Sequence, residues 1–409
     1  MLRPQPLGIF PLPAGFLLLP THPVHQEALH ALLQGRRPQQ WPASLRFFEA
    51  ALNGDLEQAI TLLHDDATPE AAYNRFVLAP AHDDYRTLSA QASPALRAVL
   101  DVAAYTVGLI DALPDPAALD GEIAAFVLLA QSAAALEQDA LTTAVDCLQR
   151  AIAVAQPVSP IFAAQLTGAL AELLHQRLGQ PEQAAVHYRQ AVRILAQTDL
   201  VQATTEMQVA FGMCLQEIAG QHRGLLLEAV RAYQAALRRL TLEVQPELYA
   251  LTHNNLALAY LAMPMTQASD QLRMGVAVQS LREALKVFRQ DTHPKYWAKA
   301  QINLANALQY LPSAHAADNL VEAVECYERV LEAGVFDTDA LDYARLLANQ
   351  GNALAHLGIH AQAIVKLERA QTLFLQHGEI DHARTVAETL TAIRAIYQPD
   401  ALSAAAPAS

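Results

Sequence analysis

A nine-residue pattern recurs six times along this chain and constrains its fold more than any other feature of the sequence. Each copy opens with Ala, has Leu or Tyr four positions later, and has Ala or Val seven positions later. These spacings place the three residues on one face of a helix, where the small side chains let a neighbouring helix approach closely. The copies start at Ala144, Ala184, Ala229, Ala277, Ala323 and Ala363, in steps of 40, 45, 48, 46 and 40 residues. Repetition at this interval predicts a solenoid of helical pairs, one pair for each step.

A partner helix is predicted upstream of four of these copies, and each partner helix ends in a turn. Gly179 and Gly358 end two of them, because a left-handed C-cap favours glycine. Pro264 and Pro312 end the other two, because proline cannot continue a helix. The sequence therefore indicates helical hairpins with defined turns.

These hairpins resemble the tetratricopeptide repeat (TPR) family, most clearly in residues 349–371 and over roughly residues 120–395. The resemblance implies an all-α fold, a right-handed α-solenoid of TPR-like helical hairpins, in a family that consists mostly of binding scaffolds. The chain departs from the usual 34-residue period. About five, eight and six extra residues lie in the turns before Ala229, Ala277 and Ala323, and we expect them to lengthen a helix or to project as loops.

Composition agrees with an all-α chain. Of the 409 residues 53% are hydrophobic, which is enough to bury a large or an extended core. Strand signals, which are alternating β-branched runs bounded by Asn-Gly or Asp-Gly turns, are almost absent. We divide the chain into an extended Pro-rich N-terminal segment, a divergent helical module, a solenoid of about six repeats and a disordered tail, at residues 1–42, 43–117, 118–397 and 398–409.

Three local features are predicted in the divergent module. A helix, a turn at Asn53-Gly54 and a second helix come first. The stretch from Leu78 to Asp84 contains a proline and two aspartates, so we expect a loop there. An apolar helix then begins near Pro94, with Ser93 as its N-cap.

The N-terminal run LGIFPLPAGFLLLP superficially resembles an export signal. Pro11, Pro13 and Pro20 interrupt it and no A-x-A cleavage site follows, so we expect it to cap the first hydrophobic face of the solenoid instead. A membrane-touching or partner-docking role is the alternative. No later stretch is apolar for the roughly 20 residues that span a bilayer, and we expect no membrane span and a cytoplasmic protein.

The charge and cysteine content exclude several classes of protein. A net charge of −14 without a basic stripe argues against a nucleic-acid partner. Cys147, Cys214 and Cys326 are too few and too scattered for a disulfide framework, so we expect buried thiols in a reducing compartment.

No sequence motif indicates catalysis. The chain has no phosphate-binding glycine loop, no G-x-S-x-G, no C-x-x-C and no H-E-x-x-H. His356 and His360 have the spacing of two metal ligands on one helix, but Gly358 lies between them at a predicted turn. We therefore expect a protein that is not an enzyme, with no metal and no cofactor.

The strongest functional signal is a row of asparagines at matching repeat positions. Asn255, Asn303 and Asn349 hold the sixth position of three successive first helices, and Asn306 and Asn352 hold the ninth position of two. Asparagine is a poor residue in a helix interior, because its amide competes for backbone hydrogen bonds. In a TPR solenoid these positions point into the concave groove. The resemblance implies that Asn255, Asn303 and Asn349 hold an extended peptide backbone, and helical spacing adds Asn306 and Asn352.

Basic residues accompany the asparagines. Lys299 and Arg345 hold the second position of the same helices, which matches the basic positions of TPR grooves that bind carboxylates. Gln309 and His356 are expected one turn further along the same wall. The predicted partner is therefore a protein or peptide segment that bears a carboxylate or an acidic side chain.

Several alternatives stay open. The asparagines can instead bond to the neighbouring helix and fix the repeat register, and Trp297 is either a packing residue or a contact residue of the groove. The block from Met263 to Pro312 faintly resembles TPR proteins that accompany bacterial uptake hydrogenases, which implies an assembly or maturation factor for a metalloenzyme. A self-assembling structural scaffold, which would be a homo-oligomer, is the third hypothesis.

Overall fold

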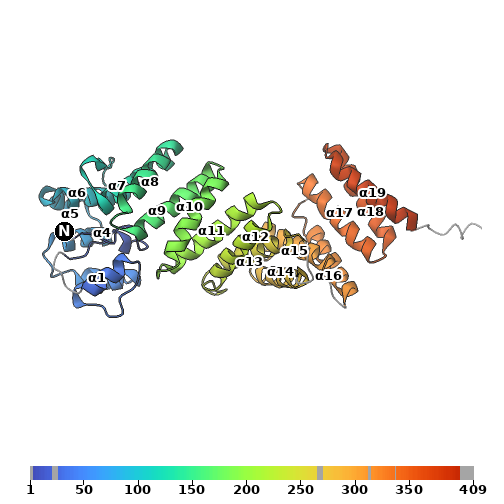
Figure 1. The fold of residues 1–409 in the computed structure, drawn as a ribbon, viewed down its shortest axis with the longest axis horizontal. Coiled ribbons are helices and arrows are strands. Elements are labelled where there is room, and N and C mark those ends of the chain that lie inside the picture. The colour runs from blue at the N-terminus through green and yellow to red at the C-terminus, as the bar shows by residue number, and fades with distance from the viewer. Residues whose placement is uncertain (1–2, 21–25, 265–269, 312–314, 337, 397–409) are drawn as a thin grey trace, which may run out of the picture. The chain divides into compact units, whose positions relative to one another are not determined.

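The computed structural model describes residues 3–20, 26–264, 270–311, 315–336 and 338–396, and all regular elements in these ranges are helices. This confirms the all-α class and the TPR-like hairpins. The chain divides into two compact units, Met1–Ile218 and Ala219–Ser409, and the helices of each can be followed in Figure 1. The predicted tail at 398–409 lies outside the described residues, and the four predicted domain ranges remain predictions.

The first unit begins with short elements and continues with longer helices. They are η1 (Ala14–Phe16), α1 (Gln26–Leu33), η2 (Ala43–Leu45), α2 (Arg46–Leu52), α3 (Leu56–Leu62), α4 (Pro69–Leu78), α5 (His82–Gln91), α6 (Pro94–Thr106), η3 (Pro116–Ala118), α7 (Gly121–Glu137), α8 (Leu141–Ala155), α9 (Pro160–Glu172), the π-helical turn η4 (Leu173–Arg177), α10 (Pro181–Leu195) and α11 (Val201–Ala219).

The second unit consists of longer helices. They are α12 (Arg223–Leu237), α13 (Pro246–Leu261), α14 (Asp270–Ala284), α15 (Pro294–Gln309), α16 (Ala316–Glu332), α17 (Ala340–His356), α18 (His360–Gln376) and α19 (Ile380–Ile396).

Two of the predictions for the divergent module are confirmed and one is wrong. The helices on either side of Asn53-Gly54 are α2 and α3, and Ser93 caps α6 by accepting a hydrogen bond from the Leu96 N–H. The expected loop from Leu78 to Asp84 is limited to residues 79–81, because α5 already begins at His82. Its two aspartates lie in the first turn of α5, where carboxylates stabilise the positive end of the helix dipole.

Consecutive helices pack as hairpins in both units. In the first unit α7 packs on α8 and α9 on α10; in the second, α13 packs on α14, α15 on α16 and α17 on α18. Successive first helices of the second unit also touch, α13 with α15, α15 with α17 and α17 with α19. The first helices of the second unit therefore form a continuous layer.

The nine-residue pattern forms the contact face of the second helices, as predicted. All six opening alanines are fully buried, and no residue four or seven positions later is more than 2% exposed. Gly179 and Gly358 have φ of +60° and +79°, which confirms the predicted left-handed caps. Pro264 follows the end of α13 at Leu261, whereas Pro312 lies outside the described residues.

The extra residues before Ala229 lengthen helices. Because α11 runs to Ala219 and α12 starts at Arg223, only residues 220–222 are left for the turn. The other two long turns are partly outside the described ranges, at 265–269 and 312–314. Their described ends extend α14 back to Asp270 and α16 back to Ala316.

Candidate functional site

The predicted site residues of α15 and α17 form one stripe on each of these two helices of the second unit. On α15 the stripe contains Lys299, Asn303 and Asn306, whereas Leu304 and Leu308 are buried. The spacings of four and three residues keep the stripe on one side of the helix. The lysine is exposed and the asparagines are half-buried, so the stripe borders solvent.

The stripe on α17 is similar and also contains a histidine. It contains Arg345, Asn349, Asn352 and His356, with the two asparagines half-buried and the arginine and histidine exposed. Because α15 and α17 touch, we treat Asn303, Asn306, Asn349 and Asn352 together as the amide face.

Two asparagines of the row, Asn255 and Asn303, bond to Asn254, the residue before Asn255 on α13. Asn303 Nδ2 on α15 lies 3.5 Å from Asn254 Oδ1 on α13, and Asn254 Nδ2 lies 3.4 Å from Asn255 Oδ1. Both distances are at the long end of the hydrogen-bond range, so each bond is weak. The bond between Asn303 and Asn254 joins α13 to α15, as the alternative that the asparagines fix the repeat register requires.

Asn306 and Gln309 bond within their own hairpin. Gln309 Nε2 donates to the Tyr327 hydroxyl at 2.6 Å, and that hydroxyl donates to Asn306 Oδ1 at 2.5 Å. Tyr327 is a buried residue of α16, and burial raises the pKa of its phenol above the ordinary value, which keeps the proton available for Asn306. These two amides fasten α15 to α16.

Asn349 and Asn352 differ from the other asparagines. Their half-buried side chains make no hydrogen bond with any described residue. A half-buried amide without a protein partner keeps two donors and an acceptor for water or a ligand. These two positions are therefore the open part of the amide face.

Two of the four lysines form ion pairs. Lys286 Nζ lies 2.6 Å from Glu283 Oε2, and Lys366 Nζ lies 3.8 Å from Glu328 Oε2. Lys299 and Lys295, one turn before it on α15, are exposed and make no ion pair with a described residue. Both unpaired lysines of this acidic chain therefore lie on the helix that carries Asn303.

Arg345 has a partner on its own helix. Its Nη1 lies 2.9 Å from Asp342 Oδ1, three residues earlier. The two side chains are 50% and 38% exposed, and a surface pair of this kind contributes only about 0–1 kcal/mol. An anionic ligand can therefore replace Asp342 as the partner of Arg345 with little loss of free energy.

Trp297 is a packing residue. It is 7% exposed and belongs to the core that α13, α14, α15, α16 and α17 share, so it is not at the surface of the stripe. His356 is the last residue of α17, whereas His360 is the first of α18, with Gly358 in the turn between them. Within the described ranges, no group of three histidine, cysteine or acidic side chains is placed to hold a metal ion.

The three cysteines are buried and free. Burial raises the pKa of the Cys214 and Cys326 thiols to about 11, which disfavours the reactive thiolate at neutral pH. Among the described helices none is both long and apolar enough to cross a bilayer.

Sequence reasoning missed two partners. Tyr327 is the central residue of its nine-residue copy, and its position predicted burial but not the bonds of its hydroxyl to α15. Asn74 in α4 was not singled out at all. Its Oδ1 accepts from the Leu18 N–H and its Nδ2 donates to the Leu18 carbonyl, both at 2.8 Å. An asparagine within the short apolar helix at 69–78 was the available signal.

The hairpins, the buried small-residue pattern and the layer of first helices define a TPR-like helical repeat protein. No protein-family model and no curated protein sequence matches the chain. Solved structures that it resembles include aspartyl phosphate phosphatase F from Bacillus subtilis, with 12% identity, a TM-score of 0.39 and coverage of 85% of this chain and 90% of that one.

Two further solved structures show a similar likeness. One is a Rap protein complexed with competence and sporulation factor, with 14% identity, a TM-score of 0.38 and coverage of 86% and 96%. The other is the TPR2AB domain of yeast Sti1 in its complex with pHSP90, with 15% identity, a TM-score of 0.25 and coverage of 66% and 98%. The ligands of these complexes belong to those proteins.

Proposed function

We propose that this chain is a non-enzymatic protein-interaction scaffold that binds an extended segment of a partner protein across the amide face of α15 and α17. The observation that carries the proposal is the pair Asn349 and Asn352, whose half-buried amides have no hydrogen-bond partner among the described residues. Such amides can donate to a peptide carbonyl and accept from a peptide N–H.

The same chain already contains one contact of this type. The side-chain amide of Asn74 accepts a hydrogen bond from the Leu18 N–H and donates one to the Leu18 carbonyl, both at 2.8 Å. A helix asparagine of this protein can therefore hold a non-helical backbone in the manner that the proposal requires of α17.

The unpaired cations favour an acidic or carboxylate-bearing segment. Lys295 and Lys299 lie beside the amide face without ion pairs to described residues, and Arg345 has only an exposed partner. Attraction between these cations and a carboxylate adds specificity for charge to the hydrogen bonds of the amides.

The proposal is tested with an Asn349→Ala/Asn352→Ala variant. A partner captured from native lysate by the wild-type chain is reduced to its shortest binding peptide, which is then titrated by calorimetry against both proteins. Each neutral hydrogen bond contributes about 0.5–1.5 kcal/mol, so the variant should bind roughly 1–3 kcal/mol more weakly, about five- to 150-fold.

The matched control is Gln362→Ala/Gln376→Ala, which removes two exposed amides from α18. It should bind the peptide like the wild type. Equal affinity of the Asn349→Ala/Asn352→Ala variant, with its circular dichroism unchanged, would exclude the amide face as the binding surface.

The two other hypotheses of function, a maturation factor and a self-assembling scaffold, remain predictions. An assembly or maturation factor for a metalloenzyme would co-purify with a subunit of that enzyme, such as one of an uptake hydrogenase. A self-assembling scaffold would show a mass in light scattering that rises with protein concentration.

A further inference from the structure

Residues 3–20, which we call the N-terminal segment, run across helices of the first unit. Phe16 packs edge-on against Phe126 of α7, with ring centroids 4.7 Å apart. Gly8 lies so close to α9 that an added Cβ would be 2.1 Å from the Phe162 ring. The segment therefore contacts α7 and α9, which are the first helices of two hairpins.

Side chains of the helices hold the backbone of this segment. Besides the two bonds between Asn74 and Leu18, Gln165 Nε2 of α9 donates to the Ile9 carbonyl at 2.9 Å. The Tyr73 hydroxyl of α4 donates to the Phe16 carbonyl, also at 2.9 Å. Hydrogen bonds from side-chain amides and hydroxyls to backbone groups are also the means by which a groove binds a separate peptide.

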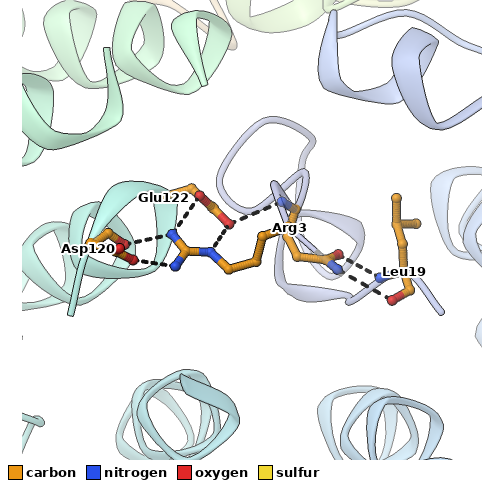
Figure 2. Close-up of polar contacts among 5 residues, drawn as sticks. Arg3, Leu19, Asp120 and Glu122 are labelled. Atoms are coloured by element: carbon orange, nitrogen blue, oxygen red, sulfur yellow. Dashed lines mark hydrogen bonds and ion pairs between the residues drawn. The ribbon is translucent and has the colours of Figure 1, made fainter. Parts of the chain in front are cut away.

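A charged contact anchors one end of the segment, as Figure 2 shows. Arg3 Nε and Nη2 donate to the two carboxylate oxygens of Glu122 at 2.9 and 3.1 Å, and Arg3 also pairs with Asp120. Glu122 belongs to α7 and is 1% exposed, so its charge is compensated by a residue of the segment. The backbone of Leu19 bonds to the Gln5 side chain within the segment, at 2.7 and 3.4 Å.

Most of the apolar side chains of the segment are buried against the unit, whereas Leu12 is 68% exposed. Leu7, Ile9, Leu17 and Leu18 are fully buried. Burial of this extent makes spontaneous release slow, because every apolar group returns to water when the segment leaves.

We propose that the N-terminal segment is a tethered peptide ligand of the first unit. The surface formed by α4, α7 and α9 recognises a turn-containing, proline-interrupted apolar peptide with an arginine near its N-terminal end, and the chain supplies that peptide itself. This surface is distinct from the amide face, and the proposal does not depend on partner binding there.

The test uses the full chain with a specific protease site placed directly after Pro20. After cleavage, the N-terminal piece should stay with the remainder through gel filtration, with the helical circular dichroism unchanged. A fluorescent synthetic peptide of residues 3–20, added in excess, should then replace it slowly, at one peptide per chain. The uncleaved chain should not take up the peptide, because its surface is filled.

Two outcomes would overturn the proposal. Loss of helical signal when the piece leaves would make the segment an integral part of the core. Uptake of the peptide by the uncleaved chain at the same rate would show that the segment does not occupy the surface. Partner binding by α15 and α17 is measured separately, so either proposal can fail while the other stands.

A Gln165→Ala variant tests the contact directly. Losing one hydrogen bond to the Ile9 carbonyl should raise the rate of peptide exchange about two- to tenfold. Gln131→Ala is the matched control, because Gln131 Nε2 donates at 2.9 Å to the Pro114 carbonyl, which lies outside the segment. Equal exchange rates in the two variants would contradict recognition of the segment backbone by Gln165.

Discussion

Gly351 of α17 lies directly against Leu367 of α18: a Cβ added to the glycine would be 2.7 Å from Leu367 Cγ and 3.3 Å from the Ala363 carbonyl oxygen. Leu367 and Ala363 are the central and opening residues of the last nine-residue copy, and both are fully buried. The two helices therefore come close together at a point where one of them has no side chain, which is the close approach that the small-residue pattern predicts.

Gly351→Ala should destabilise the chain by about 1–3 kcal/mol, because the new methyl group must displace a buried leucine and approach backbone. Gly275→Ala is the matched control, since Gly275 is also within a helix and has open space where its Cβ would be. It should be neutral or stabilise by up to about 1 kcal/mol, because alanine favours helix over glycine. Urea unfolding of both variants measures the difference, and equal effects would contradict the close approach.

Arg3→Gln should destabilise the first unit by about 2–4 kcal/mol, because it leaves the buried Glu122 carboxylate without its cation. The loss of stability should lie near the lower end of this range, because Arg3 itself is about one-third exposed and solvent screens its charge. Adding Glu122→Gln should restore much of the loss, since no buried charge then remains. Urea unfolding of the single and double variants checks this, and a double variant less stable than Arg3→Gln would be inconsistent with the explanation.

Tyr327→Phe should cost about 1–3 kcal/mol, because Asn306 and Gln309 both lose their bonds to the buried hydroxyl. Tyr310→Phe is the control: Tyr310 directly follows α15 and is 64% exposed, so its hydroxyl is not needed for packing. Its effect should stay within about 0.5 kcal/mol. Thermal unfolding of the two variants distinguishes them, and similar midpoints would mean that the hydroxyl does not fasten α15 to α16.

His253 should make the protein less stable as pH falls. Burial lowers the pKa of His253, with Glu283 acting in the opposite direction and Lys286 in the same direction. Its ring packs edge-on against Tyr249 at 4.4 Å, and the Tyr249 hydroxyl donates to Glu283. The unfolded chain takes up the proton at the ordinary histidine pKa of about 6.5, before the folded chain does, so stability is lost as pH falls below that value.

A His253→Phe variant keeps a ring beside Tyr249 but cannot take up a proton. Its melting temperature should fall less than that of the wild type between about pH 7.5 and about pH 5.5, the window around the ordinary histidine pKa. His187, whose pKa burial also lowers, is present in both proteins and cancels in the comparison. A parallel decline of the two proteins would show that His253 does not contribute.

Much of the fold follows from short-range spacing. Ala323, Tyr327 and Val330 share a helix face because of their offsets alone, and their burial was predictable without tertiary information. The aspartates after Ala81 show where this reasoning fails. Aspartate is common both in loops and in the first turn of a helix, and the sequence alone did not separate the two in α5.

The candidate site was only partly predictable. The sequence by itself determined that Asn303, Asn306, Asn349 and Asn352 occur at matching helix positions, because that depends only on helical period. Only the tertiary structure decided that Asn306 is bonded to Tyr327, 21 residues later, while Asn349 and Asn352 are left without a partner among the described residues. The partner of an amide depends on which side chain the packing of another helix brings within about 3 Å, and local periodicity does not contain that information. For the same reason the bond between Leu18 and Asn74, which are 56 residues apart, could not be predicted from the sequence.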